Sequence, residues 1–409
     1  MSFNKLLIVT MLALLFSCQN NKDESASKKT LSDSIKESEV MDTISVKDSS
    51  ATQVTLPTIN DTLNELANFI SGNSSEQSVL FKEFKKKSAY TSFSTQFSKR
   101  WMNFDSTKLL PIKNFVGSEF STHGKGSNIF YPFSGPDILY CATLFPDAAQ
   151  YTLIGLEPVG TLPIIDDKKI IADSIQNYFT KINSSLNAIL KFSFFRTVNM
   201  KEDLRNDEVD GTIHLLLLFL NKTNHQITSI KPFYIDSTGT KQYLKSTNAL
   251  NSGSIKNKSV EIITINKNNV LKTITYTSTD LSDGALKKNK GLIAYINNLK
   301  FETTYLKGAS YLMHKGNFGE IRKLILNNTQ RIVQDDSGIA LHYITKDKNK
   351  WDYVFYGDYT KPINMFTQHY QPDLDSLYKL KGAKKLGFGL GYNYRDKNSN
   401  FMIIKKASS

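Results

Sequence analysis

The sequence predicts an α/β fold: a mostly parallel sheet with flanking helices, some antiparallel strands and a C-terminal β-hairpin. Three observations support this prediction. Residues 129–157 show the succession of strand, tight turn, helix and strand that opens a parallel βαβ unit. Residues 175–190 place apolar side chains at the helical period. The run 213–220 (IHLLLLFL) has the pattern of a strand that is buried on both faces.

The βαβ unit is the densest run of structural signals in the chain. Ile129–Phe133 is the first strand and Ser134-Gly135-Pro136-Asp137 is the turn. Ile138–Phe145 is the helix, and Tyr151–Leu156 is the second strand. The predicted α/β domain therefore covers residues 129–409, and a helical segment over residues 59–128 precedes it.

Other elements follow from the same rules. In the helical segment, Asn60 or Asp61 caps a first helix, a second pattern runs from Glu76 to Trp101, and Leu109-Leu110-Pro111 breaks it. Antiparallel strands are expected at Ile227–Ile235, Ser259–Ile265 and Val270–Thr277, and further strands at Thr303–Met313 and Gln330–Val333. Helices are expected at Lys287–Asn298, Asn317–Asn327 and Leu374–Leu380, and the terminal hairpin pairs Leu386–Tyr394 with Phe401–Lys405.

The N-terminus has the pattern of a secretion signal. Lys5 is followed by the apolar run Leu6–Phe16, which is too short to span a bilayer. The sequence Leu-Phe-Ser-Cys that ends at Cys18 resembles a bacterial lipoprotein signal, which implies a signal peptide over 1–17 and a diacylglycerol- and palmitate-modified Cys18. The alternative is an ordinary signal peptide with an incidental cysteine.

Residues 18–58 are polar and form a predicted flexible tether to the membrane. Its start, Lys22-Asp23-Glu24, resembles the surface-export signal of Bacteroidetes lipoproteins. We therefore expect an outer-membrane lipoprotein that can face the cell surface. Residues 22–60 carry five lysines and seven acidic residues, so the net charge of +13 resides in the folded part. No arginine cluster with interleaved aromatics occurs, which argues against specific nucleic-acid binding.

The turn and the end of the second strand carry the one resemblance to a known fold family. Gly135 occupies the turn, and Glu157 ends the second strand 22 residues later. This arrangement is similar to the first βαβ unit of class I methyltransferase-like Rossmann domains, where an acid at this place holds the ribose hydroxyls. Pro136 lacks a backbone donor and Asp137 is negative, so the turn disfavours a phosphate and leaves a phosphate-free ligand possible.

A candidate ligand edge follows if the strands are parallel. Their carboxyl ends then gather seven residues at one edge of the sheet, where open α/β sheets bind ligands: Ser134, Gly135, Asp137, Glu157, His314, Asp335 and Asp336. The alternative is that these are turn and capping residues, which favour the same positions. The six histidines have no metal-ligand spacing, so no metal is predicted, and the catalytic residues remain unknown. Cys141 has no partner once Cys18 is acylated and is expected to be a buried thiol.

Four segments, YPFSGPD, LIGLEPVG, GASYLMHK and VQDDSGI, resemble an uncharacterised group of exported bacterial lipoproteins, which implies no activity. The first hypothesis is a membrane-anchored lipoprotein whose α/β domain binds a ligand or an envelope protein without catalysis and without a cofactor. The second is an enzyme, methyltransferase-like or hydrolytic, that uses the edge around Asp137 and Glu157, with an S-adenosylmethionine-like ligand as the alternative to no cofactor. The third is glycan or nutrient capture, which exposed aromatics at Trp351–Tyr359 and His369–Tyr370 would favour.

Overall fold

The computed structural model describes residues 56–73, 80–120, 125–162, 172–193, 209–347, 350–395 and 398–407. The predicted signal peptide, Cys18 and most of the predicted tether lie outside these residues. The chain divides into Met1–Val54 and a compact unit, Thr55–Ser409, and all that follows concerns the second unit. Among the described residues, none of the helices combines the length and the apolar character needed to cross a membrane.

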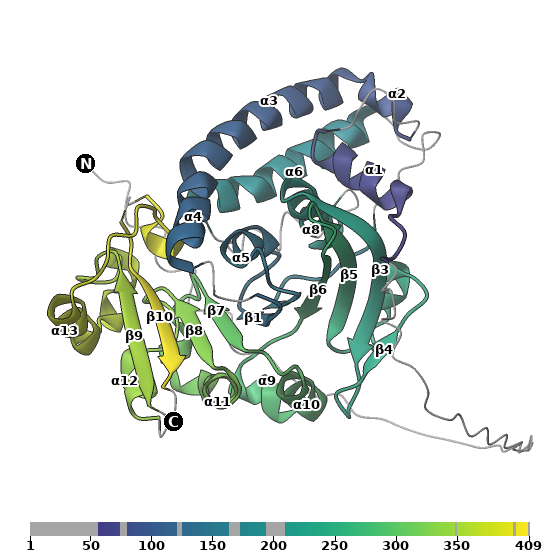
Figure 1. Ribbon diagram of the computed structural model, residues 1–409. Coiled ribbons are helices and arrows are strands. Elements are labelled where there is room, and N and C mark those ends of the chain that lie inside the picture. Colours follow the sequence, from purple (N-terminus) through teal and green to yellow (C-terminus); the bar gives the residue numbers. More distant parts are fainter. Residues whose placement is uncertain are drawn as a thin grey trace, which may run out of the picture. The chain divides into compact units, whose positions relative to one another are not determined.

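A ten-stranded sheet forms the centre of this unit, in the order β4-β3-β5-β6-β2-β1-β7-β8-β10-β9 (Figure 1). Neighbouring strands from β6 through β8 are parallel, and the pairs outside this core are antiparallel. The strands are β1 (Asn128–Pro132), β2 (Gln150–Gly155), β3 (His225–Ile235), β4 (Lys241–Tyr243), β5 (Lys258–Asn266), β6 (Leu271–Ser278), β7 (Thr303–Leu306), β8 (Arg331–Gln334), β9 (Trp351–Tyr356) and β10 (Phe401–Lys406). The predicted α/β fold with a parallel core is confirmed.

The parallel core has a Rossmann-like strand order. From β6 onward the order is β6-β2-β1-β7-β8-β10-β9, and β10 is antiparallel to both of its neighbours. Strands β5, β3 and β4 extend the sheet beyond that order at one edge.

Helices cover both faces of the sheet (Figure 1). Helices α1, α3, α5, α6 and α8 share one apolar core with one face, and α9, α10, α11, α12 and α13 share a second core with the other. Their bounds are α1 (Asp61–Ile70), α2 (Lys82–Lys85), α3 (Ser88–Phe104), α4 (Leu110–Phe115), α5 (Ile138–Leu144), α6 (Ala172–Phe192), α8 (Ile213–Lys222), α9 (Asp283–Lys287), α10 (Lys290–Asn298), α11 (Gly319–Asn328), α12 (Leu341–Thr345) and α13 (Pro372–Lys381). Side chains of the strands alternate between the two cores: in β1, Ile129 and Tyr131 face the first and Phe130 faces the second.

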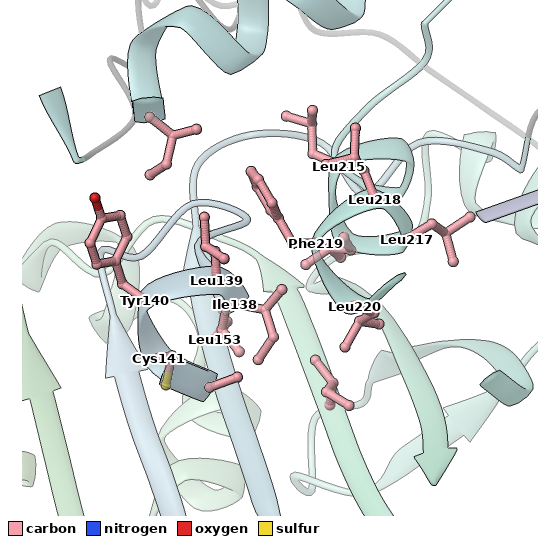
Figure 2. Packing of buried hydrophobic residues seen from close by; sticks show 14 of the residues in the cluster. Ile138, Leu139, Tyr140, Cys141, Leu153, Leu215, Leu217, Leu218, Phe219 and Leu220 are labelled. Atoms are coloured by element: carbon pink, nitrogen blue, oxygen red, sulfur yellow. The ribbon is translucent and has the colours of Figure 1, made fainter. Parts of the chain in front are cut away.

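The prediction of a buried strand at 213–220 is wrong, because this run forms most of α8. Every side chain from Ile213 to Leu220 is buried. A helix that is apolar on all sides belongs in a core, and periodicity cannot distinguish such a helix from a buried strand. Figure 2 shows Leu215 and Phe219 of α8 in the same apolar cluster as Leu139 of α5.

The predicted break at Leu109-Leu110-Pro111 is also wrong. A π-helical turn over Asp105–Leu109 joins α3 to α4, and a second π-helical turn over Val116–Phe120 continues the helical path. Pro111 lies in the first turn of α4, where a missing N–H costs little. The π-helical turn adjusts the chain so that the proline does not end the helix.

Two strand boundaries at the C-terminal side differ from the prediction. The strand expected over Thr303–Met313 ends at Leu306 and continues as a loop. The last strand, β10, pairs antiparallel with β9 and with β8, whereas 386–394 contains no strand. The antiparallel C-terminal pair is therefore present, but its first strand is Trp351–Tyr356.

Candidate ligand-binding site

A cavity of about 110 Å³ lies at the carboxyl ends of β1, β2, β6 and β7. Strands β2 and β7 lie on opposite sides of β1: the chain passes from β1 to β2 on one side, and after β6 it crosses to β7 on the other side. Ligands in open α/β sheets bind at such switch points. The cavity is lined by Tyr131, Phe133, Ser134, Gly135, Ile154, Gly155, Leu156, Glu157, Thr279, Asp280, Leu281, Lys307, Gly308, Ala309, Ser310, Leu312 and Phe318.

Two glycines let the loops of this cavity approach each other. Gly135, in the turn after β1, has a φ of 54°, which is a left-handed conformation that favours glycine. A Cβ on Gly155 would lie 2.9 Å from the Cα of Gly135 and 2.7 Å from Oε2 of Glu157. Any side chain at position 155 would therefore close the space between the turn and the end of β2.

Glu157 is the buried acid of the cavity, with 2% of its surface exposed. Its backbone carbonyl accepts a hydrogen bond of 2.8 Å from the hydroxyl of Tyr276 in β6. Burial and then the Glu157 carboxylate raise the pKa of the Tyr276 hydroxyl well above its usual value, so the phenol stays protonated. An ionised carboxylate accepts hydrogen bonds only, so this side chain suits a ligand that presents hydroxyl groups.

A buried ion pair lies beneath the cavity. Asp137 caps α5 by accepting from the backbone N–H of Tyr140 at 3.1 Å, and its other oxygen accepts from the Tyr131 hydroxyl at 2.9 Å. The Lys307 ammonium donates to Asp137 at 2.5 Å and also to the carbonyl of Ser193. Burial raises the pKa of Asp137 and lowers that of Lys307, and each charge opposes the shift of the other. Lys307, which lines the cavity, is thus already paired with a carboxylate.

The structure brings together only part of the predicted ligand edge. Ser134, Gly135 and Glu157 line the cavity, whereas Asp137 lies below it. The Ser134 hydroxyl is engaged with the carbonyls of Ile154 and Gly135. A ligand contact by these residues stays a prediction, but the carboxylates do not meet as one group in this cavity.

The other predicted edge residues lie on the far side of the loop after β7. Asp335 and Asp336 are buried and bond to that loop. His314 lines a separate cavity of about 230 Å³ together with His342 and His369. Burial lowers the pKa of His314 to about 3. In the part of the chain that the structure describes, no group of three or more histidines, cysteines or carboxylates is placed to hold a metal ion.

Four residues of the site escaped the sequence analysis. Gly155 lies near the end of the predicted strand Tyr151–Leu156, and Asp280 follows the predicted strand Val270–Thr277, so the same strand-end rule could have identified both. The sequence analysis missed Lys307 because the strand predicted over Thr303–Met313 places this residue inside a strand, whereas β7 ends at Leu306. Nothing in the sequence distinguishes Tyr276 from other strand tyrosines, and only its bond to Glu157 reveals its position.

Comparisons with known proteins add little to this site. No family model matches the chain, and no curated protein does. Among solved structures, the plantazolicin methyltransferase BpumL in complex with SAH is similar over 85% of this chain and 98% of its own length. The identity is 11% and the TM-score is 0.26. A likeness at this level does not bear on the activity of this chain.

Proposed function

We propose that the chain is a non-catalytic binding module whose switch-point cavity takes a small, phosphate-free molecule with adjacent hydroxyl groups. The nucleoside class, which includes adenosine and S-adenosylmethionine, fits this description. The observation that carries the proposal is the buried carboxylate of Glu157 in the cavity at the ends of β1 and β2. Two neighbouring hydroxyls of a ribose can donate to its two oxygens.

The charges around the cavity argue against a phosphate. Glu157 and Asp280 are both acidic, and the Lys307 ammonium is paired with Asp137. Asp137 also accepts a hydrogen bond from the Tyr140 N–H at the start of α5. A free N–H at a helix start would otherwise be available to bind an anion. A nucleotide would therefore bring its negative charge to a cavity with two acidic side chains, and among the described lining residues the one lysine is already paired.

The wall of the cavity also favours binding over catalysis. The Ser134 hydroxyl bonds to backbone carbonyls, and both carboxylate oxygens of Asp280 accept from Ser282, one from its N–H and the other from its hydroxyl. Lys307 is held by Asp137 and the Ser193 carbonyl. Ser134, Asp280 and Lys307 are thus committed to the structure, and Glu157 is left as the acceptor for ligand hydroxyls. A methyl-transfer or hydrolytic product formed by the purified chain would instead support the enzyme alternative.

Glu157→Gln tests the binding proposal. We expect adenosine or S-adenosylmethionine to raise the melting temperature of the full chain, because a ligand that binds only the folded state stabilises it; at about 100 times its Kd the gain is about 2.7 kcal/mol. Glu157→Gln should lose most of this shift, since an amide cannot accept at both positions. The measurement is a thermal-shift titration, and Glu302→Gln, at an exposed position before β7, is the matched control. A shift that survives Glu157→Gln would contradict the proposal.

We further propose that Cys18 anchors the chain as an outer-membrane lipoprotein, which the sequence around Ser17-Cys18 supports. In bacteria fed an alkyne-bearing palmitate, the wild-type chain should become labelled and fractionate with membranes. Cys18→Ser should abolish the label, because the thiol that takes the lipid is absent. Labelling of Cys18→Ser, or an unlabelled wild type, would refute the anchor.

The glycan-capture alternative needs exposed aromatic side chains. Tyr370 is 43% exposed, but Trp351 and Tyr359 are buried, so the aromatic surface is smaller than that alternative needs.

A further inference from the structure

The loop after β7 has an unusual backbone. Gly308 has a φ of 58°, and Ser310 and Tyr311 both have a φ of 51°. The left-handed region is unfavourable for residues with a Cβ, and here two adjacent non-glycine residues adopt it. Such a conformation persists only where the surrounding structure fixes it, and it is typical of ligand clamps and active sites.

The segment after β8 supplies the contacts that fix this loop. The Tyr311 hydroxyl donates to Oδ2 of Asp336 at 2.5 Å. The N–H of Gly308 donates to Oδ2 of Asp335 at 3.0 Å, and the N–H of Ala309 donates to the Ser337 hydroxyl at 2.9 Å. Each of three consecutive residues, 335–337, thus holds one residue of the loop.

Asp336 is itself held in place, so the contact is rigid at both ends. Its second carboxylate oxygen accepts from the Asn400 amide at 2.9 Å, and its backbone N–H donates to the Asn400 oxygen at 2.7 Å. The ring of Tyr311 is fully buried and stacks on His369, with ring centroids 4.9 Å apart. Tyr311 therefore points away from the ligand cavity and into a packed aromatic cluster.

The other residues of the same loop form a wall of the ligand cavity. Gly308, Ala309, Ser310 and Leu312 all line it. The position of this wall thus depends on Tyr311, which does not line the cavity itself. We propose that the Tyr311–Asp336 hydrogen bond is a latch that sets the cavity wall, which makes Tyr311, Asp335 and Asp336 positioning residues of the binding site.

The inference has two parts: the hydrogen bond fixes the loop, and the fixed loop favours ligand binding. The second part rests on the proposed function, and the test measures the two parts separately. Tyr311→Phe removes the hydroxyl but keeps the buried ring. Tyr305→Phe is the matched control, because the buried Tyr305 hydroxyl of β7 has no hydrogen-bond partner among the residues that the structure describes. Hydrogen exchange of the Gly308 and Ala309 amides is measured in the full chain without ligand, and the Kd of adenosine is measured alongside the free energy of unfolding.

In Tyr311→Phe, the loop amides should exchange at least about tenfold faster, since a hydrogen bond to a carboxylate is lost. The Kd of adenosine should rise about tenfold relative to Tyr305→Phe at matched stability. If the exchange rates of the Gly308 and Ala309 amides are unchanged in Tyr311→Phe, the hydrogen bond does not fix the loop, and the latch is overturned whether or not adenosine binds. Faster exchange with an unchanged Kd overturns its role in positioning. If adenosine does not bind the wild type, the proposed function and the second part of the inference fall together, and the exchange result still decides the latch.

Discussion

Asp137→Asn should lower the free energy of unfolding by about 3–5 kcal/mol, the usual cost of breaking a buried ion pair. The side chains of Lys307 and Asp137 are 0% and 1% exposed. Asparagine has nearly the same shape and can still cap α5, so the loss comes from the charge. The Lys307 ammonium would remain buried without its carboxylate partner, beside the Ser193 carbonyl and the Tyr140 ring, whose centroid lies 3.7 Å away. Urea unfolding at pH 7 measures the effect.

Two further variants distinguish this cause from general damage. The double variant Asp137→Asn with Lys307→Met should recover most of the loss, because no unpaired charge then remains in the core. Glu83→Gln breaks the exposed pair with Lys86 and should have no measurable effect. A double variant as unstable as Asp137→Asn alone would show that the buried charge is not the reason for the loss.

Acidification from pH 7.5 to pH 5 should cost about 2 kcal/mol of stability for each of two buried histidines. Burial lowers the pKa of both His214 and His225 to about 4. The Nδ1 atom of His214 lies 3.0 Å from the Tyr178 hydroxyl, and that of His225 lies 2.9 Å from the Thr223 hydroxyl. The unfolded histidines take up protons near pH 6.5 and the folded ones only near pH 4. The unfolded state therefore binds more protons in this window, and stability falls as pH falls.

Comparison of variants isolates this effect. Asp336 acts in the opposite sense, because burial and the nearby Asp335 raise its pKa to about 7, so protonation near neutrality stabilises the fold. The difference between wild type and His214→Asn cancels that contribution. In His214→Asn the loss between pH 7.5 and pH 5 should shrink by about 2 kcal/mol. His342→Asn, at a half-buried site, should change this pH-dependent loss of stability less. An equal change in both variants would contradict the attribution of the loss to the buried histidine.

The βαβ unit could be predicted because its signals are local. A proline and a glycine mark the turn at 134–137, and apolar runs mark the two strands of the unit. The same rules placed Gly135 and Glu157 at the edge where the cavity lies. Local pattern is enough there because parallel strands bring their carboxyl ends to the same edge.

Other features depend on contacts between distant parts of the chain. The run 213–220 is apolar throughout, and only its packing against α1, α5 and β3 decides that it is a helix. Strand-end position alone could not separate Glu157, which lines the cavity, from Asp137, which pairs with a lysine 170 residues away. Likewise, Asp335 and Asp336 lie at a strand end as predicted, but their partners on the loop after β7 could not be read from the sequence.

The central claim is that the switch-point cavity binds a phosphate-free nucleoside through Glu157. Isothermal titration of the full chain with adenosine and with adenosine monophosphate tests it most directly, with Gly155→Ala as the variant that fills the cavity without changing its charge. We expect adenosine to bind at one site, the monophosphate to bind at least about tenfold more weakly because its charge meets an acidic cavity, and Gly155→Ala to bind neither. Tighter binding of the monophosphate, or adenosine binding that persists in Gly155→Ala, would contradict the account.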